Sequence, residues 1–238
     1  MNLELHHISK SYGSLEVLND LSIDFLEARI NCILGPSGCG KTTLLNIIAG
    51  LSRPDQGGLN GFTGKEISYI FQEDRLLPWK SVKENIRFIL QSKYTGAELE
   101  RIIQKNISLI ELEKFSEYFP GQLSGGMKRR VSIARAFSYP SEIVLLDEPF
   151  KGIDISLKQN LMMSIQYLWE SDRRTLIYVT HDIEEALSMG HRIFIFSGRP
   201  AEVIGRFEHP VPAGPGKIFS AQDNQLKENI RSLLIPLK

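Results

Sequence analysis

The sequence predicts an α/β protein with a mainly parallel central sheet and a helical insertion. Three observations support this prediction. A glycine-rich phosphate-binding loop, residues 35–42, lies between a strand-like segment and a helix-like segment. Apolar strand and helix patterns alternate from residue 143 to residue 189, as in parallel βαβ units. Between these regions, residues 76–138 are mainly helical in pattern, with apolar residues at three- and four-residue steps.

The composition is that of an ordinary globular protein. The 238 residues are 42% hydrophobic, and 28 Lys and Arg balance 28 Asp and Glu. A formal charge of zero argues against a nucleic-acid binder held by bulk electrostatics. No apolar run approaches the roughly 18–20 residues that span a bilayer. Residues 1–7 have no basic start and no apolar core, so we expect no secretion signal. Cys39 lies inside the phosphate loop, so a disulfide to Cys32 is disfavoured and a reducing compartment is expected.

Strand patterns dominate the first part of the chain. Clusters of apolar residues bounded by turn residues predict strands at 3–5, 17–18, 21–25, 30–34 and 67–71. A helix is expected over 42–49, with its apolar side chains facing a sheet, and a turn over 53–58.

The later elements follow the same logic. An amphipathic helix is expected within 97–119; Pro120 and Gly121 stop it, and a second helix starts near 128. Residues 210–216 are rich in Pro and Gly and predict a loop. The remaining predicted elements are strand 143–147, helix 156–170, strand 175–180, helix 182–189, strands 193–196 and 202–204, and a short helix at 225–234.

The phosphate loop carries the clearest chemistry. Gly35-Pro36-Ser37-Gly38-Cys39-Gly40-Lys41-Thr42 fits the pattern G-x-x-x-x-G-K-[ST]. Its glycines let backbone N–H groups approach phosphates, and the following helix directs its positive end at them. Lys41 would contact the β- and γ-phosphates, the Thr42 hydroxyl would ligate Mg²⁺, and Thr43 would add a phosphate contact. A chance glycine turn is disfavoured, because a strand precedes the loop and a helix follows it.

A second cradle of backbone amides lies at Ser124-Gly125-Gly126, at the start of a helix. By itself it is equally typical of a glycine turn between helices. The segment Leu123-Ser124-Gly125-Gly126-Met127, between the phosphate loop and the acidic strand end, resembles the signature of ATP-binding-cassette (ABC) ATPases. The flanking residues 128–136 extend the match.

This resemblance implies an ABC cassette of the P-loop NTPase fold, with a parallel core sheet, N-terminal antiparallel strands and a helical subdomain. It implies one domain over 1–238, with the helical subdomain at about 76–138 and a C-terminal tail at about 205–238. It also implies a head-to-tail dimer, in which Ser124, Gly125 and Gly126 close over ATP held by a second cassette.

The resemblance also implies roles for single residues. Asp147 would hold Mg²⁺ through water, and Glu148 would be the general base, although two acids after a strand also suit a solvated strand end. Gln72 corresponds to the glutamine that meets Mg²⁺ and the attacking water. His181 corresponds to the switch histidine that contacts the γ-phosphate, and Asp154 to the aspartate that communicates across the dimer.

Two further features are a tyrosine before a glycine and a pair of consecutive histidines. Tyr12, just before Gly13, fits the aromatic residue that stacks on adenine, with an ordinary strand-end tyrosine as the alternative. His6 and His7 are consecutive on a strand and point to opposite faces, which disfavours a metal site.

The chain is most similar to ATP-binding subunits of bacterial importers for nitrate, sulfonates and taurine, through residues 71–79 and 81–86. In such subunits this stretch helps to form a groove for the coupling helix of a permease. Leu76, Leu77 and Trp79 suit such a surface, with satellite core packing as the alternative. The resemblance implies ATP hydrolysis at the cytoplasmic face of the membrane as a peripheral subunit. The implied partners are a second, identical cassette, permease subunits and, indirectly, a solute-binding protein.

A non-transport ABC ATPase, for example in cofactor assembly, is the competing hypothesis. DNA-repair types contain a long coiled coil and ribosome-acting types have two cassettes, and this chain shows neither feature. The chain also departs from the family pattern, with Met127 in place of the common glutamine, Lys151 in place of glycine and His191 in place of aspartate. These departures leave the solute undefined but remove no catalytic group.

Overall fold

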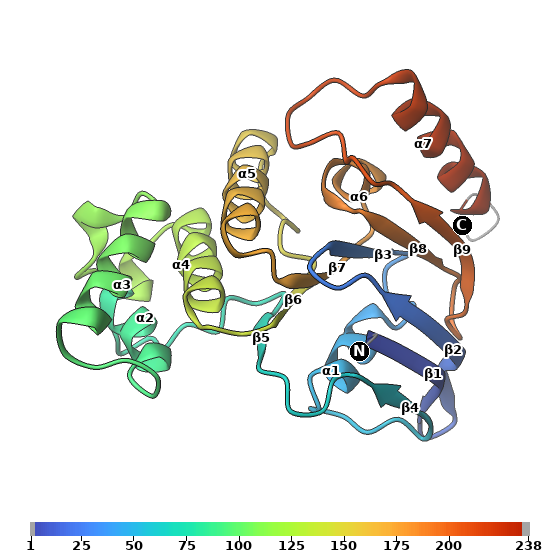
Figure 1. The fold of residues 1–238 in the computed structure, drawn as a ribbon, viewed down its shortest axis with the longest axis horizontal. Helices are drawn as coiled ribbons and strands as arrows, with labels where there is room; N and C mark the ends of the chain where they lie inside the picture. The colour runs from blue at the N-terminus through green and yellow to red at the C-terminus, as the bar shows by residue number, and fades with distance from the viewer. Residues whose placement is uncertain (1–2, 235–238) are drawn as a thin grey trace.

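Two sheets and a group of helices make up the computed structural model, which describes residues 3–234 (Figure 1). The larger sheet has six strands in the order β5-β6-β7-β3-β8-β9. Its strands are β3 (Ile30–Leu34), β5 (Ile67–Ile70), β6 (Ile143–Asp147), β7 (Thr175–Thr180), β8 (Arg192–Phe196) and β9 (Val203–Glu208). All neighbouring pairs are parallel except β8 and β9, so the phosphate-loop strand β3 lies between β7 and β8 in a mainly parallel sheet.

The smaller sheet is antiparallel and N-terminal. It has the order β2-β1-β4, with β1 (Leu3–Tyr12), β2 (Leu15–Phe25) and β4 (Gln56–Asn60). The prediction of a turn over 53–58 is therefore wrong for residues 56–58. This strand has low intrinsic strand propensity, because it carries Gly57 and Gly58, and its pairing with β1 makes it a strand.

Alternating side chains of the central strands belong to two cores. In β6, Val144 and Leu146 pack on one face of the sheet, while Ile143 and Leu145 pack on the other. The first face is covered by α4 (Gly125–Ser138), α5 (Ile155–Asp172), α6 (Ile183–Met189) and α7 (Ala221–Leu234). The second is covered by α1 (Lys41–Ile48) and the antiparallel sheet. Because both faces are covered, the strands read as nearly continuous apolar runs.

The helical insertion has an apolar core of its own. It consists of α2 (Val82–Leu90), α3 (Gly96–Leu109) and one side of α4, and it projects from the β5 edge of the sheet (Figure 1). Ser81 and Glu84 form a capping box at the start of α2: the Glu84 N–H donates to the Ser81 hydroxyl, and the Ser81 N–H donates to the Glu84 carboxylate.

Several element boundaries differ from the prediction. Helix α4 begins at Gly125 rather than near 128, since Ser124 caps it through the Met127 N–H at 3.3 Å. The helix expected within 97–119 ends at Leu109, so Pro120 is not what stops it; Pro120 instead opens a short 3-10 helix, Pro120–Gln122, which follows another at Glu113–Phe115. Helix α7 begins at Ala221 rather than near 225.

Some expectations concern other properties of the chain. No helix between residues 3 and 234 is both long and apolar enough to cross a membrane. Cys32 and Cys39 are buried, unbonded thiols. Residues 1–2 and 235–238 of the predicted domain lie outside the described residues. Residues 1–2 also begin the segment 1–7, in which no secretion signal is expected.

Candidate active site

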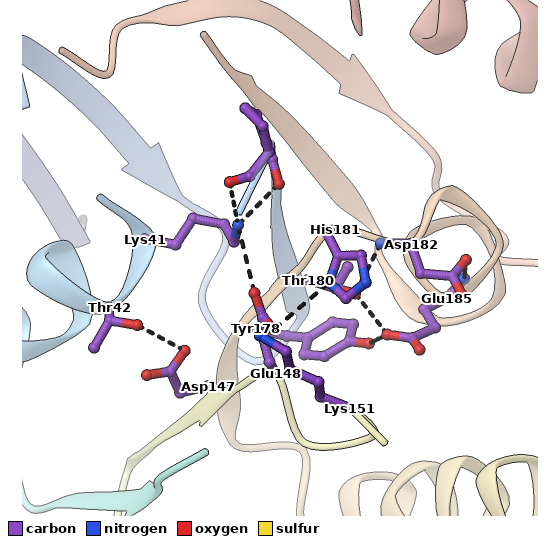
Figure 2. Close-up of polar contacts among 12 residues, drawn as sticks. Lys41, Thr42, Asp147, Glu148, Lys151, Tyr178, Thr180, His181, Asp182 and Glu185 are labelled. Atoms are coloured by element: carbon purple, nitrogen blue, oxygen red, sulfur yellow. Dashed lines mark hydrogen bonds and ion pairs between the residues drawn. The ribbon is translucent and has the colours of Figure 1, made fainter. Parts of the chain in front are cut away.

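The carboxyl ends of three neighbouring strands bring two predicted catalytic residues and the phosphate loop together. In the order β6-β7-β3, the chain continues into Glu148 after β6, His181 after β7 and the phosphate loop after β3. Parallel strands end at the same edge of a sheet, which is where open α/β proteins place their ligands. Figure 2 shows Lys41, Glu148 and His181 converging there.

The phosphate loop is held by its own lysine. The Lys41 ammonium, only 4% exposed, donates to the carbonyl oxygens of Gly35 and Pro36, both at 2.8 Å. Gly40 caps α1 at a φ of 123°, and a Cβ there would lie 2.8 Å from Leu18, so both the backbone angle and the space require glycine. The guanidinium of Arg199, from the loop after β8, donates to the Gly38 carbonyl at 3.1 Å. The loop is therefore fixed from both sides.

The other members of the predicted loop differ in exposure. Ser37 and Gly38 are exposed, while Cys39 is buried and its pKa is raised by that burial. Thr43 lies in the first turn of α1.

Asp147 and Thr42 form a site that suits a divalent cation. The Thr42 hydroxyl donates to one Asp147 carboxylate oxygen at 3.1 Å, and the Tyr69 hydroxyl lies 3.4 Å from the other. Burial raises the pKa of Asp147, and the neighbouring Glu148 adds to this. A cation would relieve this cost by neutralising the carboxylate. Within residues 3–234, no three His, Cys, Asp or Glu side chains form a metal cage. Mg²⁺ suits such a sparse site, because it is usually held by one or two protein groups together with phosphates and water.

Glu148 lies among three cationic or basic groups. Its Oε1 is 3.6 Å from Lys41 Nζ, and its Oε2 is 3.0 Å from Lys151 Nζ and 3.5 Å from His181 Nδ1. Burial disfavours the charged carboxylate, but the charges of Lys151, Lys41 and His181 outweigh it and lower the pKa of Glu148. Its backbone has a φ of 42°, in the left-handed region, and its N–H donates to the Val179 carbonyl at 3.1 Å. The carboxylate is thus charged and directed into the site.

A buried polar network lies directly behind His181. The hydroxyls of Tyr178 and Thr180 both donate to the buried carboxylate of Glu185, the latter at 2.6 Å (Figure 2). Lys158 of α5 forms ion pairs with Glu185 at 2.7 Å and with Asp182 at 2.6 Å. This network was not among the features predicted from the sequence. Asp182, directly after His181, and Glu185, three residues after Asp182, indicate a helix N-terminus. No residue near them in the sequence indicates that Lys158 of α5 is their partner.

The signature residues Gly125 and Gly126 line a cavity to which the phosphate loop does not contribute. This cavity of about 280 Å³ is lined by Gln72, Gly125, Gly126, Lys151 and Asp154, among others. Asp154 caps α5 through the Leu157 N–H at 3.0 Å, much as Ser124 caps α4. Within the described chain, no hydrogen bond or ion pair joins residues 124–126 to residues 35–42. The predicted catalytic residue Gln72 thus lines the signature cavity together with Lys151, the neighbour of Glu148, whereas no residue of the phosphate loop lines it.

Comparison with known proteins identifies the family. The profile of the ABC transporter family matches residues 18–151. The chain belongs to the ABC transporter family.

Individual relatives agree with the family match. The cassette is 37% identical to the nitrate import ATP-binding protein NrtD of Synechococcus elongatus, over 81% of this chain and 74% of the relative. It is 36% identical to the aliphatic sulfonates import ATP-binding protein SsuB of Bacillus cereus, over 87% and 84%. A solved dimeric structure of MJ0796, a bacterial ABC transporter cassette, matches with a TM-score of 0.76 and 31% identity, over 87% of this chain and 98% of that one. The chain is an ATP-binding ABC ATPase, and the predicted fold is confirmed.

One arginine of the cassette joins three segments that the sequence analysis treated separately. Arg129 of α4 is buried and donates to the carbonyls of Pro149 at 2.6 Å and Phe71 at 2.7 Å. It also lies 3.3 Å from Asp74. The signature helix is therefore bonded both to the segment after Glu148 and to the end of β5. From the sequence, the basic cluster around Arg129 was interpreted only as part of the family resemblance, and these bonds were not predicted.

The aromatic and apolar predictions have mixed outcomes. Tyr12 is 51% exposed at the end of β1, with Lys10 Nζ 5.4 Å from its ring centre, so one face is available for stacking. Trp79 is 70% exposed. Leu76 and Leu77 are half-buried instead, and Leu76 packs against the core of the helical insertion. Leu76 therefore follows the alternative of satellite core packing, while the surface role of Leu77 and Trp79 stays a prediction.

Proposed function

We propose that this cassette is the ATP-hydrolysing subunit of a bacterial importer for small solutes of the nitrate, sulfonate or taurine kind. The observation that carries this proposal is the convergence of Lys41, Thr42, Asp147, Glu148 and His181 at one edge of the sheet. The named import functions of the NrtD and SsuB relatives support the transport part. The solute itself would be selected by a permease and a separate solute-binding protein.

The phosphate loop would bind ATP. Lys41 would exchange its bonds to the loop carbonyls for bonds to the β- and γ-phosphates, keeping its buried charge paired. The Thr42 hydroxyl, the Gln72 side chain and, through water, Asp147 would hold Mg²⁺, which would supply positive charge to offset the charge that develops on the phosphates. The proposed ATP-binding residues are Tyr12, Gly35, Pro36, Ser37, Gly38, Cys39, Gly40, Lys41, Thr42 and Thr43.

Hydrolysis would use the residues around Glu148. Its lowered pKa keeps the carboxylate ionised at neutral pH, so it can accept a proton from an attacking water. His181, 3.5 Å from Glu148, would contact the γ-phosphate, and Gln72 would help to orient the water. These three residues would be catalytic.

The separation of Ser124, Gly125 and Gly126 from the phosphate loop supports a dimer of cassettes. A cradle of backbone amides that does not reach the nucleotide of its own chain can serve that of a second copy. Asp154, in the same cavity wall as Gly125 and Gly126, would communicate between the two sites. The dimeric MJ0796 cassettes, one described with ADP and Pi, support this arrangement.

The permease would dock beside the helical insertion. A cavity of about 400 Å³ between β5, α2 and α4 is lined by Phe71, Phe88, Ile89, Arg135 and Tyr139, among others. Its mixture of aromatic, aliphatic and basic groups suits an amphipathic helix. The cassette would then be a peripheral protein at the cytoplasmic face of the membrane. We assign the chain as one ABC ATPase domain, with residues 76–138 as the helical subdomain and 205–238 as the tail.

Two experiments test the proposal. Lys41→Ala should abolish ATP binding, whereas Glu148→Gln should bind ATP and stop turnover, because Gln cannot accept the proton. The Glu148→Gln protein, with ATP, would then be used to capture partners from mildly solubilised membranes. Recovery of a multi-span permease supports transport, and its neighbouring genes would suggest the solute. Recovery of soluble assembly or ribosomal proteins alone would refute transport and leave the ATPase activity standing.

A further inference from the structure

Lys158 connects two helix N-termini that border the active site. It lies on α5, four residues after Asp154, and its backbone N–H donates to the Asp154 carbonyl at 2.9 Å. Its side chain extends away from α5 to α6, where the ammonium lies 2.6 Å from Asp182 and 2.7 Å from Glu185. The side chain is mostly buried, with 24% exposed, so solvent weakly screens these ion pairs.

The two carboxylates that Lys158 binds hold the backbone on both sides of His181. On one side, the Thr180 hydroxyl donates to Glu185 at 2.6 Å and lies 3.1 Å from the Asp182 N–H, from which it accepts. On the other side, Asp182 caps α6 by accepting from the N–H groups of Glu184 and Glu185. The position of the His181 backbone is therefore tied to the ammonium of Lys158.

The same lysine is tied to the signature cavity through Asp154. Asp154 lines that cavity and caps α5 through the Leu157 N–H. A shift of the first turn of α5 must carry Lys158 with it, because residues one turn apart in a helix are bonded rigidly. The shift then either moves Asp182 and Glu185 or breaks two partly buried ion pairs, and breaking such pairs is costly.

We propose that Lys158 is a positioning residue that couples the Asp154 segment to His181 and thereby to Glu148. This inference rests on the proposed function, since it takes the roles of Asp154, His181 and Glu148 from it. Lys158 touches neither nucleotide nor water in this scheme. It sets the place from which His181 acts.

The test uses four variants of the full chain. Lys158→Met removes the charge and keeps much of the length. Lys158→Met combined with Glu185→Gln also removes the buried negative charge, so this protein remains folded if the single variant does not. Lys158→Arg keeps the positive charge, so both ion pairs can still form. Lys227→Met is the matched control. It removes an ion pair of 2.5 Å to Glu184, which lies on α6 beside Glu185, and it leaves the ion pairs of Asp182 and Glu185 intact.

The readouts are kcat, KM for ATP and the fraction of protein that binds nucleotide. We expect Lys158→Met and the doubly substituted protein alike to bind ATP with unchanged KM and to lose roughly 10- to 100-fold in kcat, as for a displaced catalytic group. Lys158→Arg should recover most of that loss, and Lys227→Met should match the wild type.

A wild-type kcat in the folded double variant would overturn the inference. So would a fall in kcat that only follows the fraction of nucleotide-binding protein, because that is a purely structural effect. Failure of the proposed function would look different: His181→Ala and Glu148→Gln would then themselves keep wild-type turnover.

Discussion

The buried imidazole of His191 predicts a specific loss of stability in mild acid. His191 is 7% exposed, its Nδ1 accepts from the Ile30 N–H at 3.3 Å, and its ring lies 4.9 Å from the Trp169 ring centre. Burial, together with the positive charges of Arg29 and Arg173, lowers its pKa from 6.5 to about 4. The folded protein thus holds this histidine neutral over a range in which the unfolded chain protonates it.

The size of the effect follows from the two pKa values. Below pH 6.5 the unfolded state binds one more proton than the folded state, so the free energy of unfolding falls as the pH falls, until about pH 4. The full difference, 6.5 minus about 4, corresponds to about 3 kcal/mol at roughly 1.4 kcal/mol per pKa unit. By pH 5 about 2 kcal/mol of this should be lost, which is a large part of a typical stability of roughly 5–15 kcal/mol.

The assay is urea unfolding of the wild type and of His191→Asn at a series of pH values from about 7.5 to about 5. Asn can place its Oδ1 near the position of the imidazole Nδ1, so it still accepts from Ile30 but does not titrate. The difference in unfolding free energy between the two proteins should shrink by about 2 kcal/mol towards pH 5, because only the wild type loses stability through this group. A difference that stays constant with pH would refute the argument, since every other titrating group cancels in the subtraction.

Further substitutions test the packing and the surfaces. Gly57→Ala should cost about 2–3 kcal/mol in urea unfolding, because its φ is 84° and a Cβ would lie 2.3 Å from two carbonyl oxygens of β1, whereas Gly58→Ala, in open space, should be nearly neutral. Equal effects of the two would contradict the structure. Gly126→Ala places a Cβ 2.3 Å from Leu157 Cδ2, so a double-mutant cycle with Leu157→Ala should show a coupling of about 1 kcal/mol, and additivity would show that the contact is not made. Trp79→Ala should change the unfolding free energy by less than about 0.5 kcal/mol but weaken permease capture by the Glu148→Gln protein; unchanged capture would exclude this residue from the docking surface.

The elements that could be predicted from the sequence are those specified by their own residues. Strands β6 and β7 have the predicted bounds, because each is a fully buried apolar run between polar residues. The phosphate-loop motif is also recognisable locally, since its glycines and Lys41 are close in sequence, although Arg199 and Leu18 contact it from distant segments. Strand β4 could not be found in this way, because Gly57 and Gly58 carry no strand signal and the edge of β1 supplies the pairing.

In the candidate site, too, some residues could be placed from the local sequence and others could not. Glu148 and His181 follow apolar strands, so their positions at a sheet edge could be predicted. Their neighbours could not: Lys151 lies 3.0 Å from Glu148 because the chain turns back after β6, with the Lys151 N–H donating to the Glu148 carbonyl at 3.2 Å. Lys158 and its two carboxylates are 24 and 27 residues apart in sequence, and only the packing of α5 against α6 brings them together.

The bonds of Arg129 have a mechanical consequence. A guanidinium is flat and stiff, and this one is bonded on one side to Phe71, beside the proposed permease groove, and on the other to Pro149, directly after Glu148. Hydrogen bonds of 2.6 and 2.7 Å stretch little before they break. A displacement of Phe71 would therefore strain the hydrogen bonds by which Arg129 of α4 also holds Pro149. One side chain thus links the wall of the proposed groove, the signature helix and the residue after the proposed base.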